Sequence, residues 1–356
     1  MDLGGYTAIL PGNPAASELM ARIKSASHDD LMPPPDSGMQ LSKEQITLLE
    51  RWIQQGAEYQ NHWSYVAPIR PPLPEVSRPA WTRNPIDTFI LERLNEQGLA
   101  PAPEADRVTL ARRLYLDLTG LPPTRSQVNE IRSMKDFDRE WPEVVRRVTH
   151  QPAYGERMAV FWLDLVRFAD TVGYHGDQDH SISPYRDYVI KAFNENMPYD
   201  QFTREQLAGD LLPEATLWQR IATGYNRLLQ TSHEGGVQDK EYLAKYAADR
   251  VRNFGLVWMG ATTGCAECHN HKYDPYTIED FYQLASFFSD LKQQGAYQAA
   301  NAIPTTRLPE IQAWNLTQFA QWQTLDTRLA SLSQEANLDP GIAHALSEKK
   351  QALKAT

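Results

Sequence analysis

Cysteine is nearly absent from this chain of 356 residues, which contains only Cys265 and Cys268. A disulfide framework of the kind that staples small secreted domains is therefore excluded. Apolar runs are also short, and none approaches the roughly 20 residues needed to span a bilayer, so we expect no membrane span. Residues 1–20 lack the basic and apolar segments of a signal peptide.

Strand patterns and hydrolase signatures are missing as well. No stretch alternates convincingly between apolar and polar residues. There is no Gly-rich phosphate loop, H-E-x-x-H pair or calcium loop, and the acidic residues Asp177, Asp179, Glu234 and Asp239 have no distinctive spacing. The net charge of −10, from 35 basic and 45 acidic residues, argues against nucleic acid as a partner.

What the sequence does contain is one C-x-x-C-H motif, Cys265-Ala266-Glu267-Cys268-His269. This spacing is the attachment signature of a c-type haem, in which two thiols form thioethers with the vinyl groups and the histidine ligates the iron. We therefore expect haem c as cofactor, bound by Cys265 and Cys268, with His269 as the proximal iron ligand. Such haem is attached outside the cytoplasmic membrane, so the motif predicts a periplasmic or otherwise exported protein.

Other interpretations of the two cysteines compete with haem. His271 completes a set of four potential zinc ligands, although structural zinc sites usually draw a second ligand pair from a distant segment. A redox C-x-x-C would be expected after a strand, and none is evident. A chance pairing in a loop is the remaining alternative.

Helical signals run through the chain. Capping residues and apolar spacing predict helices that begin near Ser42, Asn84, Asp106, Thr124, Ser183, Asp200, Leu217, Asp239 and Thr277. The stripe Met158, Phe161, Trp162, Leu165 and Phe168 is interpreted as core. Aromatic residues after the motif, Phe281, Tyr282, Phe287 and Phe288, are candidates to cover a porphyrin, although ordinary core packing predicts the same pattern.

These signals predict a mainly α-helical fold in four parts. Five prolines between residues 66 and 79 indicate an extended linker. We expect a helical domain at 1–62, which the family resemblance given next implies is a partial cytochrome c-like domain, the Pro-rich linker at 63–80, an all-helical domain with the C-x-x-C-H motif at 81–300, and a helical or coiled-coil spacer at 301–356.

Several ordered motifs give the chain a resemblance to planctomycete-type cytochrome c proteins. They are Trp162-Leu163-Asp164-Leu165, Pro184-Tyr185-Arg186-Asp187-Tyr188, Met197-Pro198-Tyr199-Asp200, Gln206 to Pro213, Glu234-Gly235-Gly236 and Cys265 to Pro275. Residues 80–295 resemble the domain of unknown function DUF1549 (PSCyt2), and residues 4–58 resemble the C-terminal half of the cytochrome c domain PSCyt1. The resemblance implies that Met32 would ligate a first haem only if a second, N-terminal haem motif were present, and that the chain is truncated at both ends.

The ligand opposite His269 is left open by the sequence. Candidates are His175 and His180 in one polar loop, His233 before a Glu-Gly-Gly turn, and Met259 just before the motif. His271 lies beside the proximal ligand, so a supporting contact is easier for it than iron ligation. Each histidine is equally compatible with an ordinary surface or hydrogen-bonded role.

The sequence therefore favours a c-type cytochrome that transfers electrons to an unidentified redox partner. One alternative is a haem enzyme, peroxidase-like or oxidase-like, linked to polysaccharide breakdown. Another is a cell-surface or polysaccharide-associated scaffold with a structural haem. Spin state, ligand binding and turnover distinguish these three.

Overall fold

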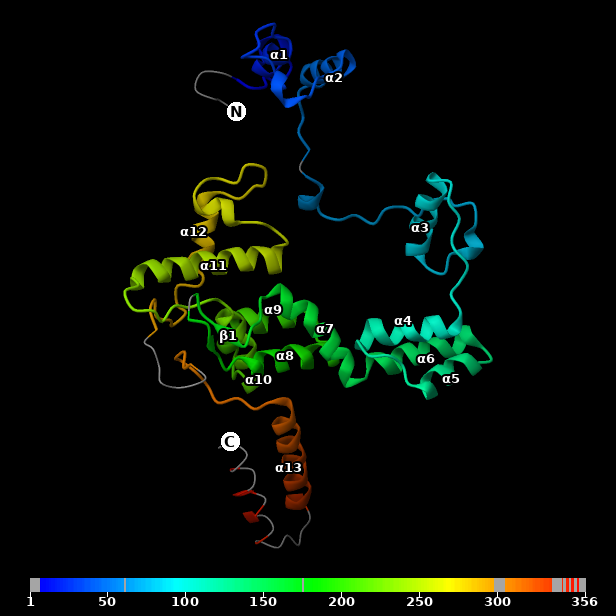
Figure 1. Cartoon of the computed structure of the whole chain (residues 1–356), viewed down its shortest axis with the longest axis vertical. Coiled ribbons are helices and arrows are strands. Elements are labelled where there is room, and N and C mark those ends of the chain that lie inside the picture. The colour runs from blue at the N-terminus through cyan, green and yellow to red at the C-terminus, as the bar shows by residue number, and fades with distance from the viewer. Residues whose placement is uncertain are drawn as a thin grey trace. The chain divides into compact units, whose positions relative to one another are not determined.

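Helices carry most of the ordered backbone, as the sequence predicts. The computed structural model describes residues 7–60, 62–174, 176–297 and 305–334, with isolated residues at 341, 344, 345, 347, 348 and 351. Within these residues there are 13 α-helices and one two-stranded sheet (Figure 1). None of the helices described there has the length and apolarity that a bilayer crossing requires. The chain divides into two compact units, Met1–Pro103 and Glu104–Thr356.

The first unit contains three helices, α1 (Glu18–Ile23), α2 (Lys43–Gln54) and α3 (Pro85–Glu96). The predicted capping box is present at α2. The Ser42 hydroxyl accepts from the Gln45 amide, and the Gln45 side-chain oxygen accepts from the Ser42 amide. Met20, Ile23 and Ile53 form a small core between α1 and α2.

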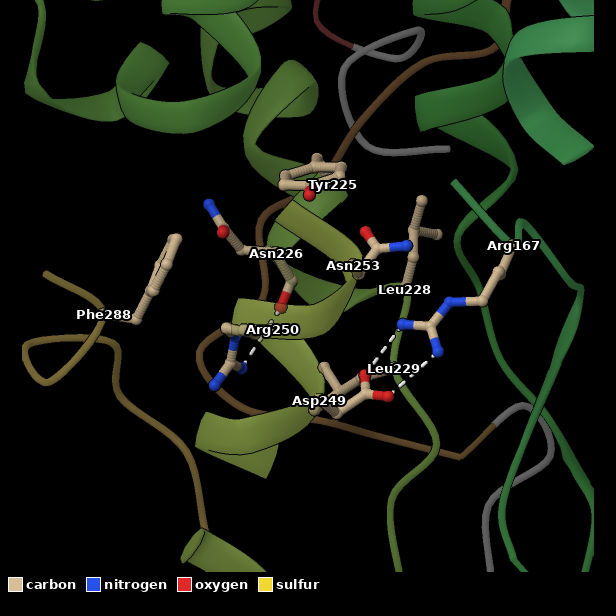
Figure 2. Close-up of a pocket in the computed structure, with 9 residues that line it drawn as sticks. All are labelled: Arg167, Tyr225, Asn226, Leu228, Leu229, Asp249, Arg250, Asn253 and Phe288. Carbon is tan, nitrogen blue, oxygen red and sulfur yellow. Dashed lines mark hydrogen bonds and ion pairs between the residues drawn. The ribbon is translucent and has the colours of Figure 1, made fainter. Parts of the chain in front are cut away.

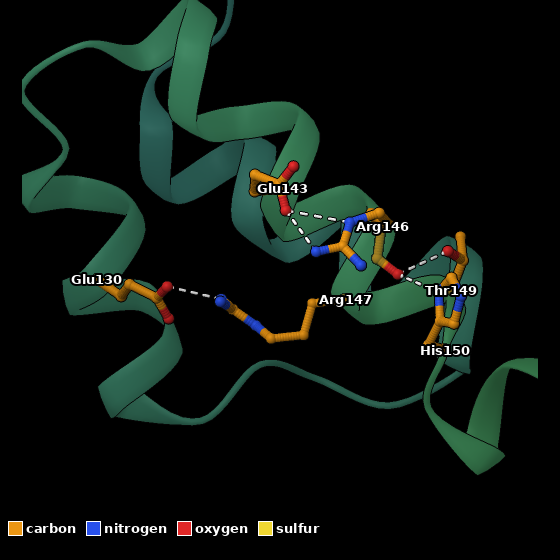
Figure 3. A network of polar contacts seen from close by, with 6 residues as sticks. All are labelled: Glu130, Glu143, Arg146, Arg147, Thr149 and His150. Carbon is orange, nitrogen blue, oxygen red and sulfur yellow. Dashed lines mark hydrogen bonds and ion pairs between the residues drawn. The ribbon is translucent and has the colours of Figure 1, made fainter.

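A three-helix bundle opens the second unit. It consists of α4 (Arg107–Thr119), α5 (Arg125–Ser133) and α6 (Phe137–Thr149), packed around Ala111, Tyr115, Ile131, Met134, Val144 and Val148. Figure 3 shows Arg147 of α6 reaching to Glu130 of α5, with a separation of 2.6 Å between Nη2 and Oε1. Both side chains are about half exposed, so this ion pair contributes at most about 1 kcal/mol, and the apolar contacts hold the bundle.

The largest core lies among α7 (Pro152–Leu165), α8 (Ser183–Asn194), α9 (Tyr199–Ala208) and α10 (Leu217–Ala222). Several of its polar groups are paired: Trp162 donates to Gln206 Oε1 at 3.1 Å, and the Tyr188 hydroxyl donates to the buried Glu205 carboxylate at 3.0 Å. Satisfied groups of this kind add specificity to an aromatic core.

Three details differ from the sequence-based expectations. A short antiparallel hairpin pairs β1 (Thr171–Val172) with β2 (Gln178–Asp179), where no strand was predicted. The helix predicted to begin near Leu217 ends at Ala222 and is followed by a 3₁₀ segment over Thr223–Arg227, in which a Cβ at Gly224 would lie 3.1 Å from Tyr185 Cβ. Phe161 is 60% exposed under the Arg157 guanidinium, so it is not part of the core stripe.

The remaining helices are α11 (Asp239–Met259), α12 (Ile278–Ser286) and α13 (Leu316–Gln334). In Figure 1 the yellow chain between α11 and α12 lies on one side of α11, while β1 and helices α7 to α10 lie on the other. The predicted capping box at α12 is present between Thr277 and Asp280. Much of the predicted C-terminal spacer lies outside the described residues.

Tyr246 of α11 makes alkaline stability a test of this packing. Its hydroxyl donates to the Gly295 carbonyl at 2.9 Å and accepts from the Ser232 amide at 2.7 Å. Burial raises the pKa of Tyr246 from 10.0 to about 12. Above pH 10 the unfolded chain therefore binds fewer protons than the folded chain, and the free energy of unfolding falls as pH rises.

We predict that Tyr246→Phe lowers the free energy of unfolding by about 1–3 kcal/mol at neutral pH, because the Ser232 amide loses its acceptor. The substitution also makes the free energy of unfolding fall less steeply above pH 10. Some of the fall remains, because the buried Tyr185, Tyr188 and Tyr225 have raised pKa values of their own. Urea unfolding at a series of pH values measures both effects. The exposed control Tyr59→Phe leaves the profile unchanged, and an equal effect of both substitutions contradicts the prediction.

Candidate functional site

The segment that leads into the C-x-x-C-H motif is fixed against α11. The helix ends at Gly260, whose φ of +60° is the left-handed conformation that favours glycine, and the chain reverses there. The Ala261 amide donates to the Gly255 carbonyl at 2.9 Å, and the Thr263 hydroxyl donates to the Val251 carbonyl at 3.2 Å. These bonds bring the motif onto the last turns of the helix.

The motif itself forms a 3₁₀ turn over Gly264–Glu267. Ala266 is fully buried in a cluster with Ala248, Val251 and Phe281, whereas Cys265 and Cys268 are exposed free thiols. The Cys268 amide donates to the Cys265 carbonyl at 3.3 Å, which closes the turn. Because residues i and i+3 nearly eclipse in a 3₁₀ turn, the two thiols are presented on the same face.

His269 follows on the exposed side of the turn, with its amide on the Cys265 carbonyl at 3.3 Å. Its ring Nδ1 lies 2.8 Å from the Asn270 carbonyl oxygen. A carbonyl only accepts, so we assign the proton to Nδ1, which leaves the lone pair on Nε2. This is the tautomer that metal-ligating histidines adopt when a backbone carbonyl orients the ring.

Neighbouring side chains frame this turn. Tyr282 of α12 donates from its hydroxyl to the Glu267 carbonyl at 3.1 Å, and the Glu267 carboxylate pairs with Arg252 of α11. The Asn270 side chain accepts from the Ile278 amide at 3.0 Å. Tyr282 is 56% exposed and Ile278 37% exposed, so exposed apolar surface lies next to the turn.

The predicted aromatic cover is only partly in place. Phe281 is buried beneath Ala266 rather than beside the thiols, and Phe288 lies against Phe254 of α11. Tyr282 and Phe287 are exposed. Ordinary core packing therefore accounts for Phe281, while Tyr282 adjoins the motif.

His271 has a structural role in the loop. Its Nδ1 accepts from the Asp274 amide at 2.9 Å, and its own amide donates to the Tyr276 carbonyl at 2.8 Å. Nowhere in the described ranges do three or more His, Cys, Asp or Glu side chains gather as metal ligands. Cys265, Cys268, His269 and His271 therefore do not converge as a zinc site would require.

The candidate ligands for the opposite face of the iron lie elsewhere. The His180 amide donates to the Asp170 carbonyl at 2.7 Å, beyond β2, and the His233 ring packs against Gly176. Both belong to the region near β1, which Figure 1 places across α11 from the motif. Among the described residues no hydrogen bond or ring contact joins either one to residues 265–269, and His175 lies outside them.

Two methionines complete the set of predicted ligands. Met259 ends α11 and is 45% exposed. Met32, in the first unit, is 42% exposed, and its amide donates to the Arg22 carbonyl at 3.3 Å. The four acidic residues noted in the sequence also lack a cation site in the described chain, and Asp177 and Asp239 accept from Thr171 and from the Ala296 amide.

The donor set fits a covalently attached haem. Two free thiols share an exposed face, a histidine with an available Nε2 follows them, and exposed apolar side chains adjoin the turn. The sequence named the three candidate ligands, and it named Tyr282 as a possible haem cover without indicating its hydrogen bond to the turn. It missed Asn270 and Arg252, which also support the turn, and only the adjacency of Asn270 to the motif was a local signal.

The geometry defines a helical protein with a haem-attachment signature on an exposed turn. The chain belongs to the family described as a protein of unknown function (DUF1549), PSCyt2, whose model matches residues 85–293. A second family model, planctomycete cytochrome C (PSCyt1), matches residues 1–36. A search of curated proteins and of solved structures found no match.

Gly255 gives a test of the contact that positions the motif. A Cβ at this helical glycine would lie 2.7 Å from Thr263 Cγ2 and 3.1 Å from the Ala261 carbonyl oxygen. Helix propensity alone predicts that Gly→Ala stabilises by about 1 kcal/mol. We predict instead that Gly255→Ala destabilises by about 1–3 kcal/mol, because the turn must move away from α11.

Thermal or urea unfolding measures this effect. Gly264→Ala is the matched control, since its added Cβ would meet Arg252 at an ordinary 3.6 Å and its φ is not in the left-handed region. A stabilising Gly255→Ala substitution, or equal losses for both variants, contradicts the close approach.

Proposed function

We propose that this chain is a c-type cytochrome that binds one haem covalently through Cys265 and Cys268, with His269 as an axial iron ligand, and that it transfers electrons outside the cytoplasm. The observation that carries the proposal is the exposed turn, on which both thiols face the same side and Nδ1 of His269 is held by a carbonyl. The likeness of residues 1–36 to planctomycete cytochrome C supports it.

The bound haem would supply one-electron iron chemistry, and the protein's own groups set its position. Ala266 anchors the turn in the core, so the backbone of the turn can keep its conformation when the haem is attached. Asn270 fixes the tautomer of His269 through its carbonyl oxygen. The exposure of Cys265, Cys268 and His269 leaves an edge of the site open to a redox partner.

An extracytoplasmic location follows from the same chemistry, because c-type haem is attached after export, and cytochrome c family domains are generally found there.

Absorption spectra of oxidised and reduced protein, with pyridine haemochrome analysis, test the attachment. The protein must be produced with an export signal and c-haem maturation machinery. We predict a covalent haem that survives denaturation in the wild-type chain and is lost in Cys265→Ala/Cys268→Ala. His269→Ala is the matched control: it retains both thioethers but changes the spectrum, because the iron loses its proximal ligand. A colourless wild-type protein contradicts the proposal.

The role of His180 and His233 is tested on the same material. Since α11 lies between these residues and the motif, we predict that His180→Ala and His233→Ala leave the haem spectrum and spin state unchanged. A shift from low spin to high spin in either variant shows iron ligation and contradicts the prediction.

Electron exchange separates the carrier from the alternatives. We expect reversible one-electron reduction by small redox mediators and negligible turnover of peroxide. Rapid peroxide turnover supports a haem enzyme instead, and a haem that exchanges no electrons supports a structural role.

A further inference from the structure

A second site lies on the side of α11 that faces the β1–β2 hairpin. A cleft of about 520 Å³ is lined there by residues of the hairpin, including Tyr174 and His180, and by the segment Arg227, Leu228, Leu229 and Gln230. This volume is in the range of sites for small organic molecules, and its wall mixes apolar with polar side chains. No part of the haem-attachment motif lines it.

Arg227 stands in this wall, and no carboxylate of the described residues pairs with it. Its Nη2 donates to the carbonyl oxygens of Lys292 at 3.2 Å and Pro309 at 3.5 Å. Both acceptors are neutral and both bonds are long. The charge of Arg227 is therefore left uncompensated at the edge of the cleft.

Arg307 adds a second cation behind the same wall. It is 3% exposed, its Nε donates to the Thr231 hydroxyl at 3.0 Å, and its guanidinium lies 4.5 Å from the centre of the Tyr297 ring. Its buried Nη2 has no hydrogen-bond partner. Burying a charged guanidinium with an unsatisfied N–H donor costs free energy, and an anion that accepts from that donor would lower the cost.

Arg250 of α11 is a second buried arginine with an unpartnered N–H donor (Figure 2). It is 8% exposed, donates to the Asn226 carbonyl at 3.3 Å and to Gln293, and has a buried Nε without a partner. Burial, and then the like charge of Arg227, lowers the pKa of Arg250 to about 10, so it stays charged at neutral pH.

The nearby carboxylates accept hydrogen bonds from groups other than Arg227, and Asp249 is paired with another arginine. Figure 2 shows Asp249 joined twice to Arg167, at 2.9 and 2.8 Å. Asp177, which also lines the cleft, accepts from the Thr171 hydroxyl at 2.9 Å, and Glu310 accepts from the backbone amide of Arg307, so neither of these two bonds involves a cation. Residues 298–304, which the structure does not describe, contain no Asp or Glu.

The pKa of His180 depends on its burial and on the nearby arginines. Burial, and then Arg307, lowers the pKa of its imidazole, with Arg227 acting in the same direction and Glu310 opposing them. The ring is therefore neutral at physiological pH and has one N–H to donate.

We propose that this cleft binds a small organic anion through an oxyanion group, either a carboxylate or a sulfate or phosphate ester, with Arg227 as its principal charge partner and His180 beside it. Tyr174 and Leu228 would contact the organic part of the ligand. The site is separate from the haem-attachment turn and does not depend on the haem proposal.

Isothermal titration calorimetry of the full chain tests the site with four probes at constant ionic strength: inorganic sulfate, inorganic phosphate, acetate and glucuronate. We predict saturable binding of at least one probe. Sulfate or phosphate alone indicates an ester ligand, whereas acetate or glucuronate alone indicates a carboxylate.

Arg227→Gln is expected to weaken that binding by about tenfold or more, because a charge-assisted contact is lost. Arg204→Gln is the control with the same change in net charge, since Arg204 is exposed on α9 and paired with Asp200. It should leave affinity unchanged. His180→Gln, which removes a ring with no side-chain hydrogen bond among those described, should weaken binding severalfold.

Circular dichroism shows whether each variant folds. If Arg227→Gln does not fold, the binding test uses His180→Gln and Arg227→Lys instead. The proposal is overturned if no probe binds saturably. It is also overturned if the folded Arg227 and His180 variants bind as tightly as wild type, or if Arg204→Gln weakens binding equally.

Discussion

The close approach between α11 and the turn that follows it is the constraint on which the site depends. Gly255 has no side chain, so Thr263 and Ala261 lie against the helix backbone and hydrogen-bond to it. Ala266 can then enter the core with Val251 and Phe281. With its middle residue buried, the short turn must present Cys265 and Cys268 outward.

The same helix separates two chemically different regions. On one side stand thiols, an imidazole and exposed apolar side chains, which suit a porphyrin. On the other side, Arg227 lines a cleft and Arg250 is buried nearby, and neither forms an ion pair with a carboxylate among the described residues. The long helix thus stands between the motif turn and the cleft.

Local signals explain why much of the fold was predictable from the sequence. Capping boxes at Ser42, Thr124 and Thr277 require residues only three positions apart, and all three are present. The C-x-x-C-H motif is local too, and it located the candidate ligands. The hairpin β1–β2 is only two residues per strand, too short for an alternating pattern to be visible.

The arginine cluster was beyond sequence reasoning because it joins distant segments. Arg307 contacts Thr231, and Arg227 contacts Pro309. These partners are far apart in the sequence, so no local spacing pattern predicts the contacts. The assignment of His180 and His233 as candidate iron ligands had the same weakness, since a histidine in a polar loop carries no sign of which side of α11 it will face.

The most direct test of the central claim is peptide mass spectrometry on the chain exported in a host that attaches c-type haem. We predict that the peptide containing Cys265 and Cys268 carries one haem linked at both cysteines. Two unmodified thiols in the exported chain, while the host's own c-type cytochromes are fully loaded, would contradict the claim.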